Sequence, residues 1–116
     1  MRKIVKIAGW LVVVAIAILS LVPGELRPHT GAPGPFEHVV AYAICAGLLT
    51  LGCDKRNQAF VIVLCLAAFA GTLEIVQIWV PGRHSDLVDF ATSSGGAFTG
   101  SVLAWVALRS LNRIFA

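Results

Sequence analysis

One long apolar stretch followed by a turn decides how the chain folds: residues 58–80 read QAFVIVLCLAAFAGTLEIVQIWV, and Pro81-Gly82 follows directly. At a helical rise of about 1.5 Å per residue, the stretch is long enough to cross the roughly 30 Å of hydrocarbon in a bilayer. Proline and glycine together commonly end a helix and reverse the chain. The stretch therefore predicts a transmembrane helix that leads into a helical hairpin.

Further apolar runs lie outward from this one, over residues about 4–22, 36–53 and 85–108. A proline- and glycine-rich loop separates the first two runs, and a polar turn at residues 54–57 precedes the hairpin. The basic start of the chain also fits a signal peptide, but no small-residue cleavage site precedes Pro23, so we expect an uncleaved first span. The sequence predicts one all-α domain over residues 1–116, built as a four-helix transmembrane bundle.

The composition favours lipid over water as the solvent of this domain. Of the 116 residues, 58% are apolar and 13% are charged, about half the charged share usual in soluble domains. The net charge is +3, but the basic residues flank the apolar runs instead of forming a stripe, which argues against a nucleic-acid partner. Cys45, Cys53 and Cys65 lack the spacing of a disulfide framework or zinc cluster, so we interpret them as small buried hydrophobic residues.

The basic residues also predict the orientation of the bundle in the membrane, because cytoplasmic loops carry an excess of Lys and Arg. With the N-terminus inside, seven of the nine basic residues lie on the cytoplasmic side, and only Arg27 and Arg83 lie outside. The seven are Arg2, Lys3, Lys6, Lys55, Arg56, Arg109 and Arg113. We therefore expect both termini in the cytoplasm.

Polar residues gather toward the outer ends of the predicted helices. Glu74 lies six residues before Val80, about 9 Å below the predicted end of its helix, where an ionised carboxylate is costly unless it is paired, hydrated or protonated. Ionisable groups at such a depth are candidates for function. The predicted ligand-binding cluster consists of His38, Glu74, Gln77, Arg83, Asp86, Asp89 and Ser93.

Helical spacing explains why these residues can meet. Gln77 follows Glu74 by three residues and shares its helix face. On the next helix, Ser93 follows Asp89 by four residues, so these two side chains also share a face. His38 reaches a similar depth from the second helix. Arg83, on the connecting turn, is the nearest cation in sequence for both acids.

Structural roles stay open for the same residues. Glu74 and Arg83 can form an ion pair that only locks the hairpin. Asp86 or the serine before it can cap the fourth helix. His38 can be an interfacial histidine with a satisfied ring, and residues 25–29 can be a solvated loop.

Small residues form ridges on the predicted fourth helix. Gly96 and Gly100, with Gly95 beside them, have the spacing that lets two helices approach closely. A second ridge of serine and alanine residues runs nearby. We expect the glycines to pack within the bundle, and a homo-oligomer formed through them is the alternative.

The hairpin also carries a known motif. Its residues are Glu74-Ile-Val-Gln77, Pro81-Gly82-Arg83, Asp89, Gly96, Gly100 and, on the second helix, His38 and Tyr42. Over residues 36–100 the chain thereby resembles the VanZ-like family of small membrane proteins. Two positions depart from the family pattern, with Pro35 in place of a frequent Lys and Ser93 in place of a frequent Asn. The family is named for a protein associated with teicoplanin resistance, so the resemblance implies a bacterial cell-envelope protein of the cytoplasmic membrane and no particular reaction.

Three functions fit the predicted site. The first is binding of a lipid head group or another envelope component, in which Arg83 meets phosphate and the acids accept hydrogen bonds. The second is a hydrolase or transferase acting on an envelope lipid, with His38 or Glu74 as general base and Asp89 as its orienting group. The third is a structural or assembly subunit.

We expect no cofactor and no metal ion, because the chain lacks the paired His-x-x-x-His spacing of many metal sites. A metal-dependent variant of the enzyme would use His38, Glu74 and Asp89 as ligands, with His84 as an optional fourth.

Overall fold

The computed structural model describes residues 2–22, 34–53, 55–82 and 87–115. Over this part of the chain there are four α-helices and no strand. The helices are α1 (Arg2–Leu21), α2 (Gly34–Leu51), α3 (Arg56–Gln77) and α4 (Leu87–Phe115). The prediction of an all-α fold, with one helix for each apolar run, is confirmed.

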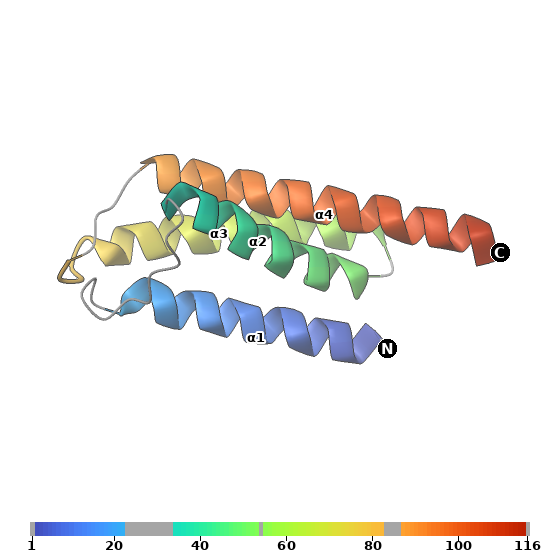
Figure 1. The fold of residues 1–116 in the computed structure, drawn as a ribbon, viewed down its shortest axis with the longest axis horizontal. Helices are drawn as coiled ribbons and strands as arrows, with labels where there is room; N and C mark the ends of the chain where they lie inside the picture. Colours follow the sequence, from blue (N-terminus) through green and yellow to red (C-terminus); the bar gives the residue numbers. More distant parts are fainter. Residues whose placement is uncertain (1, 23–33, 54, 83–86, 116) are drawn as a thin grey trace.

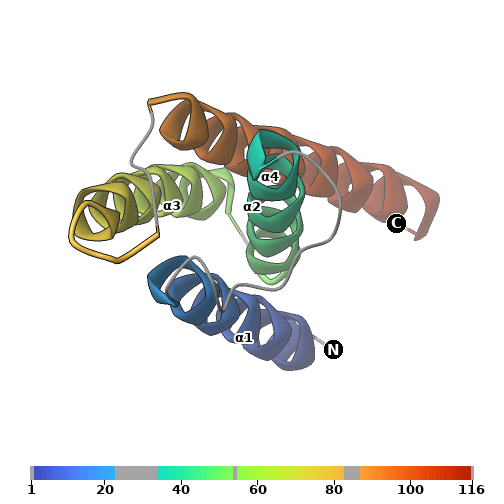
Figure 2. The same ribbon diagram turned by 60° about the vertical axis from the view of Figure 1, so that its left-hand side comes forward.

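The described helices form an up-and-down bundle (Figure 1). α1 and α3 run toward one end of the molecule and α2 and α4 run back, so the beginning of α1 and the end of α4 lie at the same end. α2 lies between the others and contacts all three, α4 most extensively (Figure 2). This order brings the start of α2, the end of α3 and the start of α4 together at the opposite end of the bundle.

Glycines let α4 approach α2 closely. A methyl group on Gly96 would come within 2.5 Å of the carbonyl oxygen of Val39, and one on Gly100 would overlap the backbone of Ala43. The expectation that Gly95 also packs within the bundle is wrong, because it is exposed and a methyl group there would meet no neighbouring atom within 4 Å. Gly96 and Gly100 are therefore used within the bundle, as expected.

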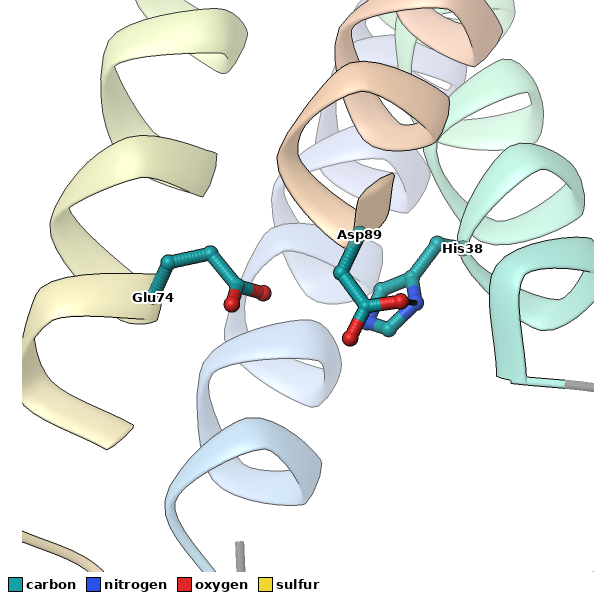
Figure 3. A group of neighbouring side chains, drawn as sticks. All are labelled: His38, Glu74 and Asp89. Atoms are coloured by element: carbon teal, nitrogen blue, oxygen red, sulfur yellow. Dashed lines mark ion pairs between the residues drawn. The ribbon is translucent and has the colours of Figure 1, made fainter. Parts of the chain in front are cut away.

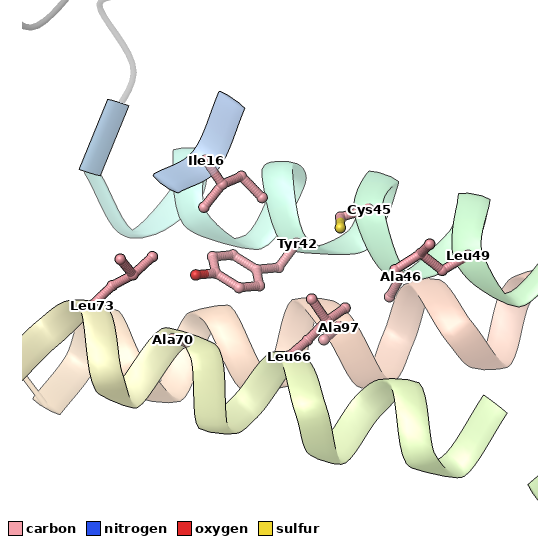
Figure 4. Close-up of a cluster of buried hydrophobic side chains, with 9 residues drawn as sticks. All are labelled: Ile16, Tyr42, Cys45, Ala46, Leu49, Leu66, Ala70, Leu73 and Ala97. Atoms are coloured by element: carbon pink, nitrogen blue, oxygen red, sulfur yellow. The ribbon is translucent and has the colours of Figure 1, made fainter. Parts of the chain in front are cut away.

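A buried core lies where α2, α3 and α4 meet, with one contribution from α1. Its members are Ile16, Tyr42, Cys45, Ala46, Leu49, Leu66, Ala70, Leu73 and Ala97. Figure 4 shows the Tyr42 ring between α2 and α3, with its hydroxyl group toward Leu73. Beside this core, the hydroxyl oxygens of Thr50 and Ser101 are 2.8 Å apart and form a buried hydrogen bond between α2 and α4.

The cysteines do not all behave as predicted. Cys45 and Cys53 are buried, but the expectation that Cys65 is buried is wrong, because it is exposed on α3. Cys65 borders a cavity of about 660 Å³ that is lined by residues of α1 and α3 and by the end of α2. An apolar run predicts a helix but does not say which face of it the neighbouring helices cover.

Two stretches, Lys3–Leu21 in α1 and Arg56–Gln77 in α3, are long and apolar enough to cross a membrane. The apolar part of α2, Phe36–Leu51, is shorter. α4 is the longest helix described and continues past the predicted boundary to Phe115, but Thr, Ser and Gly residues interrupt its apolar sequence. By length and composition alone, these two stretches of α1 and α3 are compatible with a membrane protein.

α3 ends at Gln77, three residues before the predicted boundary. The backbone N–H groups of residues 78–80 donate to carbonyl oxygens three residues earlier, which tightens the chain at the end of the helix. Gly82 then has a φ of 75°, in the left-handed region that glycine tolerates best. Glu74 is thus three residues, about 4.5 Å, from the end of its helix instead of the predicted 9 Å.

Candidate functional site

Ionisable side chains from three helices meet where α2 and α4 begin and α3 ends. His38 lies in the second turn of α2, Glu74 in the last turn of α3 and Asp89 in the first turn of α4. Figure 3 shows the Glu74 carboxylate pointing toward Asp89, whose own carboxylate lies beside the His38 imidazole. We refer to these residues as the His38–Glu74–Asp89 cluster.

The cluster is compact and partly shielded from solvent. Nδ1 of His38 lies 3.5 Å from Oδ1 of Asp89, which is an ion-pair distance when the imidazole is protonated. One nitrogen or oxygen atom from each of the three side chains lies within 4.8 Å of the other two. Glu74 is 8% exposed, whereas the side chains of His38 and Asp89 are 20% and 21% exposed. Glu74 therefore forms the inner side of the cluster.

Two buried hydroxyl groups lie one helical turn farther along α2 and α4. Tyr42 follows His38 by four residues, Ser93 follows Asp89 by four residues, and both are 2% exposed. Ser93 belongs to the predicted site. Tyr42 does not, although its four-residue spacing from His38 was a usable signal.

Gln77 makes a different contact from the one that its spacing predicts. Its Nε2 donates a hydrogen bond of 2.8 Å to the backbone carbonyl oxygen of Ser20, in the last turn of α1. Carbonyl groups in the last turn of a helix have no partner within that helix, so a buried side-chain donor is well placed there. Gln77 therefore joins α3 to the end of α1.

The remaining predicted site residues, Arg83 and Asp86, lie outside the described residues, as does the alternative metal ligand His84. The predicted ion pair between Glu74 and Arg83 and the predicted helix cap at Asp86 therefore also lie outside the described residues.

The chemistry of the cluster favours ligands that are cationic or that donate hydrogen bonds. Carboxylates accept hydrogen bonds, and an imidazole can donate, accept or ligate a metal. The cluster can therefore bind amine and hydroxyl groups or hold a metal cation. It can also use His38 as a general base that Asp89 orients.

Comparison of the chain with protein-family models, with curated proteins and with solved structures found no match. The VanZ-like resemblance stays a prediction from the motif residues. Three of these residues form the His38–Glu74–Asp89 cluster, and the two glycines of the motif lie at the contact between α2 and α4.

Proposed function

We propose that this chain is a VanZ-like integral membrane protein of the bacterial cell envelope, in which the His38–Glu74–Asp89 cluster binds the polar head group of an envelope lipid. One observation carries the proposal: ionisable side chains from three helices meet at one end of a bundle whose outside is apolar. A site of this kind recognises a polar group that is delivered at the end of apolar helices.

Exposed apolar side chains support a location in the membrane. Trp10, Ile44, Phe60 and Leu103 lie on α1, α2, α3 and α4, and each is at least 52% exposed. Water-soluble monomers rarely expose apolar surface on this scale, whereas lipid tails would cover it. The 18 residues of α2 span about 27 Å, close to the thickness of the hydrocarbon layer, so its shorter length suffices for a span.

The place of the cluster in the bundle supports a role at head-group level. Each of its residues lies within two turns of a helix end, which in a spanning bundle is the boundary between hydrocarbon and water. Basic residues mark the opposite end, and the positive-inside rule assigns that end to the cytoplasm and the cluster to the outer face. The described basic residues at that end are Arg2, Lys3, Lys6, Lys55, Arg56, Arg109 and Arg113.

The charges of the cluster define the class of head group. Glu74 and Asp89 can accept hydrogen bonds from hydroxyl or amine groups, and His38 can donate to a phosphate oxygen. A head group that carries sugar hydroxyls or an amine next to a phosphate offers both kinds of contact. Lipid-linked sugars and amine-containing phospholipids are therefore the expected ligands.

Lipid that stays bound to the purified protein tests this proposal. We expect native mass spectrometry in mild detergent to detect a retained envelope lipid, and the Glu74→Gln, Asp89→Asn double variant to retain about 10-fold less, as the loss of charge-assisted hydrogen bonds predicts. Glu37→Gln removes the carboxylate next to His38 in the sequence and should retain the wild-type amount. If all three proteins retain equal amounts of lipid, the cluster does not bind the head group and its role in this assay is only structural.

The distance between His38 and Asp89 favours a second candidate, a hydrolase or transferase acting on the same class of lipid. An imidazole 3.5 Å from a carboxylate approaches the arrangement of a general base and its orienting acid, in which the hydrogen bond often tightens only when substrate binds. Under this function, the purified protein releases or transfers a labelled head group, and His38→Gln abolishes turnover while lipid stays bound. No turnover by the wild-type protein would leave binding as the function.

A further inference from the structure

The geometry of the cluster points to a bound metal: we infer that His38, Glu74 and Asp89 together ligate one divalent transition-metal ion of the Zn²⁺ or Mn²⁺ class. The inference deepens the proposed function and rests on it in treating the cluster as the binding site. It departs from the sequence-based expectation of no metal, which depended on the absence of a His-x-x-x-His pair on one helix. Here the ligands come from three helices instead.

The donor atoms suit a transition metal with an open coordination position. Zn²⁺ and related ions accept imidazole nitrogen and carboxylate oxygen, and sites with three protein ligands commonly keep a position for a water or substrate oxygen. Mg²⁺ and Ca²⁺ prefer oxygen ligands alone, so the imidazole of His38 selects against them. Placing the three ligands on helices holds them more rigidly than a loop would.

The distances approach those of ligands around a single ion. Two ligands bonded tetrahedrally to Zn²⁺ lie roughly 3.3 Å apart, because each bond is about 2.0–2.1 Å long. Nδ1 of His38 and Oδ1 of Asp89 are 3.5 Å apart, which is long for a direct hydrogen bond but close to that separation. Glu74 completes a set of ligand atoms within 4.8 Å of one another. A change of side-chain torsions in Glu74 closes the remaining distance of roughly 1.5 Å.

The charges of the cluster provide a separate argument. Two carboxylates bring like charges together at one end of an apolar bundle, and one of them, Glu74, is only 8% exposed. The two negative charges match the charge of one divalent cation. A divalent cation with a neutral imidazole and two carboxylates has a net charge of zero.

The ion also explains how an acidic cluster can attract a phosphate. His38 and Asp89 are about one-fifth exposed, so the open coordination position faces the outside of the bundle. A phosphate oxygen of a head group fits that position and meets the positive charge of the ion there. The metal therefore supplies the positive charge that meets the phosphate. The carboxylate oxygens that do not bind the metal can still accept hydrogen bonds from the sugar or amine of the head group.

Metal analysis of the purified full-length protein tests the inference. The protein is stripped with a chelator and dialysed against Zn²⁺ or Mn²⁺ alone. We expect about one equivalent of metal to remain. His38→Gln, Glu74→Gln and Asp89→Asn should each weaken the affinity at least about 100-fold, since loss of a direct ligand exceeds the effect of outer-shell changes. Glu37→Gln, the matched control on α2, should bind as the wild type does.

Two results overturn the inference. One is a wild-type protein that retains less than about a tenth of an equivalent. The other is equal retention by the wild type and the three variants, which would mean adventitious binding at exposed acids. Where a variant fails to fold, the visible absorption spectrum of the wild-type protein loaded with Co²⁺ is measured instead. Bands typical of a low-symmetry site with a nitrogen ligand support the inference. A spectrum identical to that of aqueous Co²⁺ overturns it.

Lipid retention measured on the same samples separates this inference from the proposed function. Lipid held by a protein that binds no metal keeps the proposed function and removes the metal site. If the protein binds metal but retains no lipid, either before or after it is loaded with metal, the metal site is supported and the proposed head-group binding is rejected.

Discussion

Gly100 of α4 lies so close to the backbone of Ala43 in α2 that a single methyl group on it would overlap the Ala43 carbonyl oxygen. Gly95, little more than one turn earlier on the same helix, has no atom within 4 Å of the position that its Cβ would take. A side chain at Gly100 would therefore disturb the packing of α4 on α2, and a side chain at Gly95 would not. The sequence alone does not distinguish the two positions, because both belong to the same run of small residues.

Alanine substitutions distinguish the two positions. We expect Gly100→Ala to lower the free energy of unfolding by about 1–3 kcal/mol, because the added methyl group forces α4 away from α2. Gly95→Ala should be neutral or stabilising by up to roughly 1 kcal/mol, since alanine favours the helix. Thermal unfolding of both variants in one detergent measures the difference, and equal melting temperatures would contradict the close packing.

The hydrogen bond between Thr50 and Ser101 predicts an energetic coupling of α2 to α4. The two residues are 0% and 4% exposed, so water cannot replace the bond when one partner is removed. A double-mutant cycle with Thr50→Val and Ser101→Ala is expected to give a coupling of about 0.6–1.7 kcal/mol, the range for hydrogen bonds between membrane helices.

A cycle with Thr99→Val is the matched control. Thr99 is exposed, and its Oγ1 donates to the carbonyl oxygen of Gly95 in its own helix. Its coupling to Thr50→Val should be near zero. If Ser101 shows no larger coupling than Thr99, the two helices do not meet through these hydroxyl groups.

Gln77→Leu is expected to loosen the end of α1. Leucine has a similar size but cannot donate to the Ser20 carbonyl oxygen, and a lost hydrogen bond costs about 0.5–1.5 kcal/mol. Hydrogen exchange should speed up at Val22, whose N–H donates to Ile18 in the last turn of α1. Thr72→Val, an exposed change on the same helix, should leave that exchange rate unchanged. An unaltered rate in Gln77→Leu would mean that the glutamine does not hold α1.

The apolar runs predict the order of the helices well and the end of α3 poorly. Residues 78–80 are as apolar as the helix before them, so hydropathy places no boundary at Gln77. Backbone hydrogen bonds to carbonyls three residues back and the positive φ of Gly82 end the helix there instead. This geometry is not visible in composition, and it halves the predicted depth of Glu74.

The cluster itself was largely predictable, because an antiparallel hairpin brings Glu74 and Asp89 to the same end and the second helix starts at that end too. The role of Gln77 was not predictable. A spacing of three residues puts Gln77 on the face of Glu74 but does not tell which helix covers each position, and α1 reaches Gln77 through Ser20. Tertiary packing decides between neighbours that share a face.

Cysteine labelling tests the proposed position in the membrane with a residue that the chain already has. Cys65 is exposed near the middle of α3, beside a mainly apolar cavity, so in a bilayer it lies at the depth of the hydrocarbon and a charged maleimide cannot reach it. In a water-soluble protein the same thiol would react at once. We expect no labelling of Cys65 in intact membranes and full labelling after denaturation in SDS, with the modified peptide identified by mass spectrometry.

Two introduced cysteines then test the orientation. Asn57→Cys lies in the exposed first turn of α3, and Trp79→Cys lies in the exposed turn that follows the helix. On intact cells the charged reagent should modify Trp79→Cys and should reach Asn57→Cys only after the membrane is opened, because the basic residues lie at the Asn57 end. The opposite labelling pattern would mean that the bundle has the reverse orientation in the membrane. The His38–Glu74–Asp89 cluster would then face the cytoplasm, where no head group of the outer leaflet could reach it.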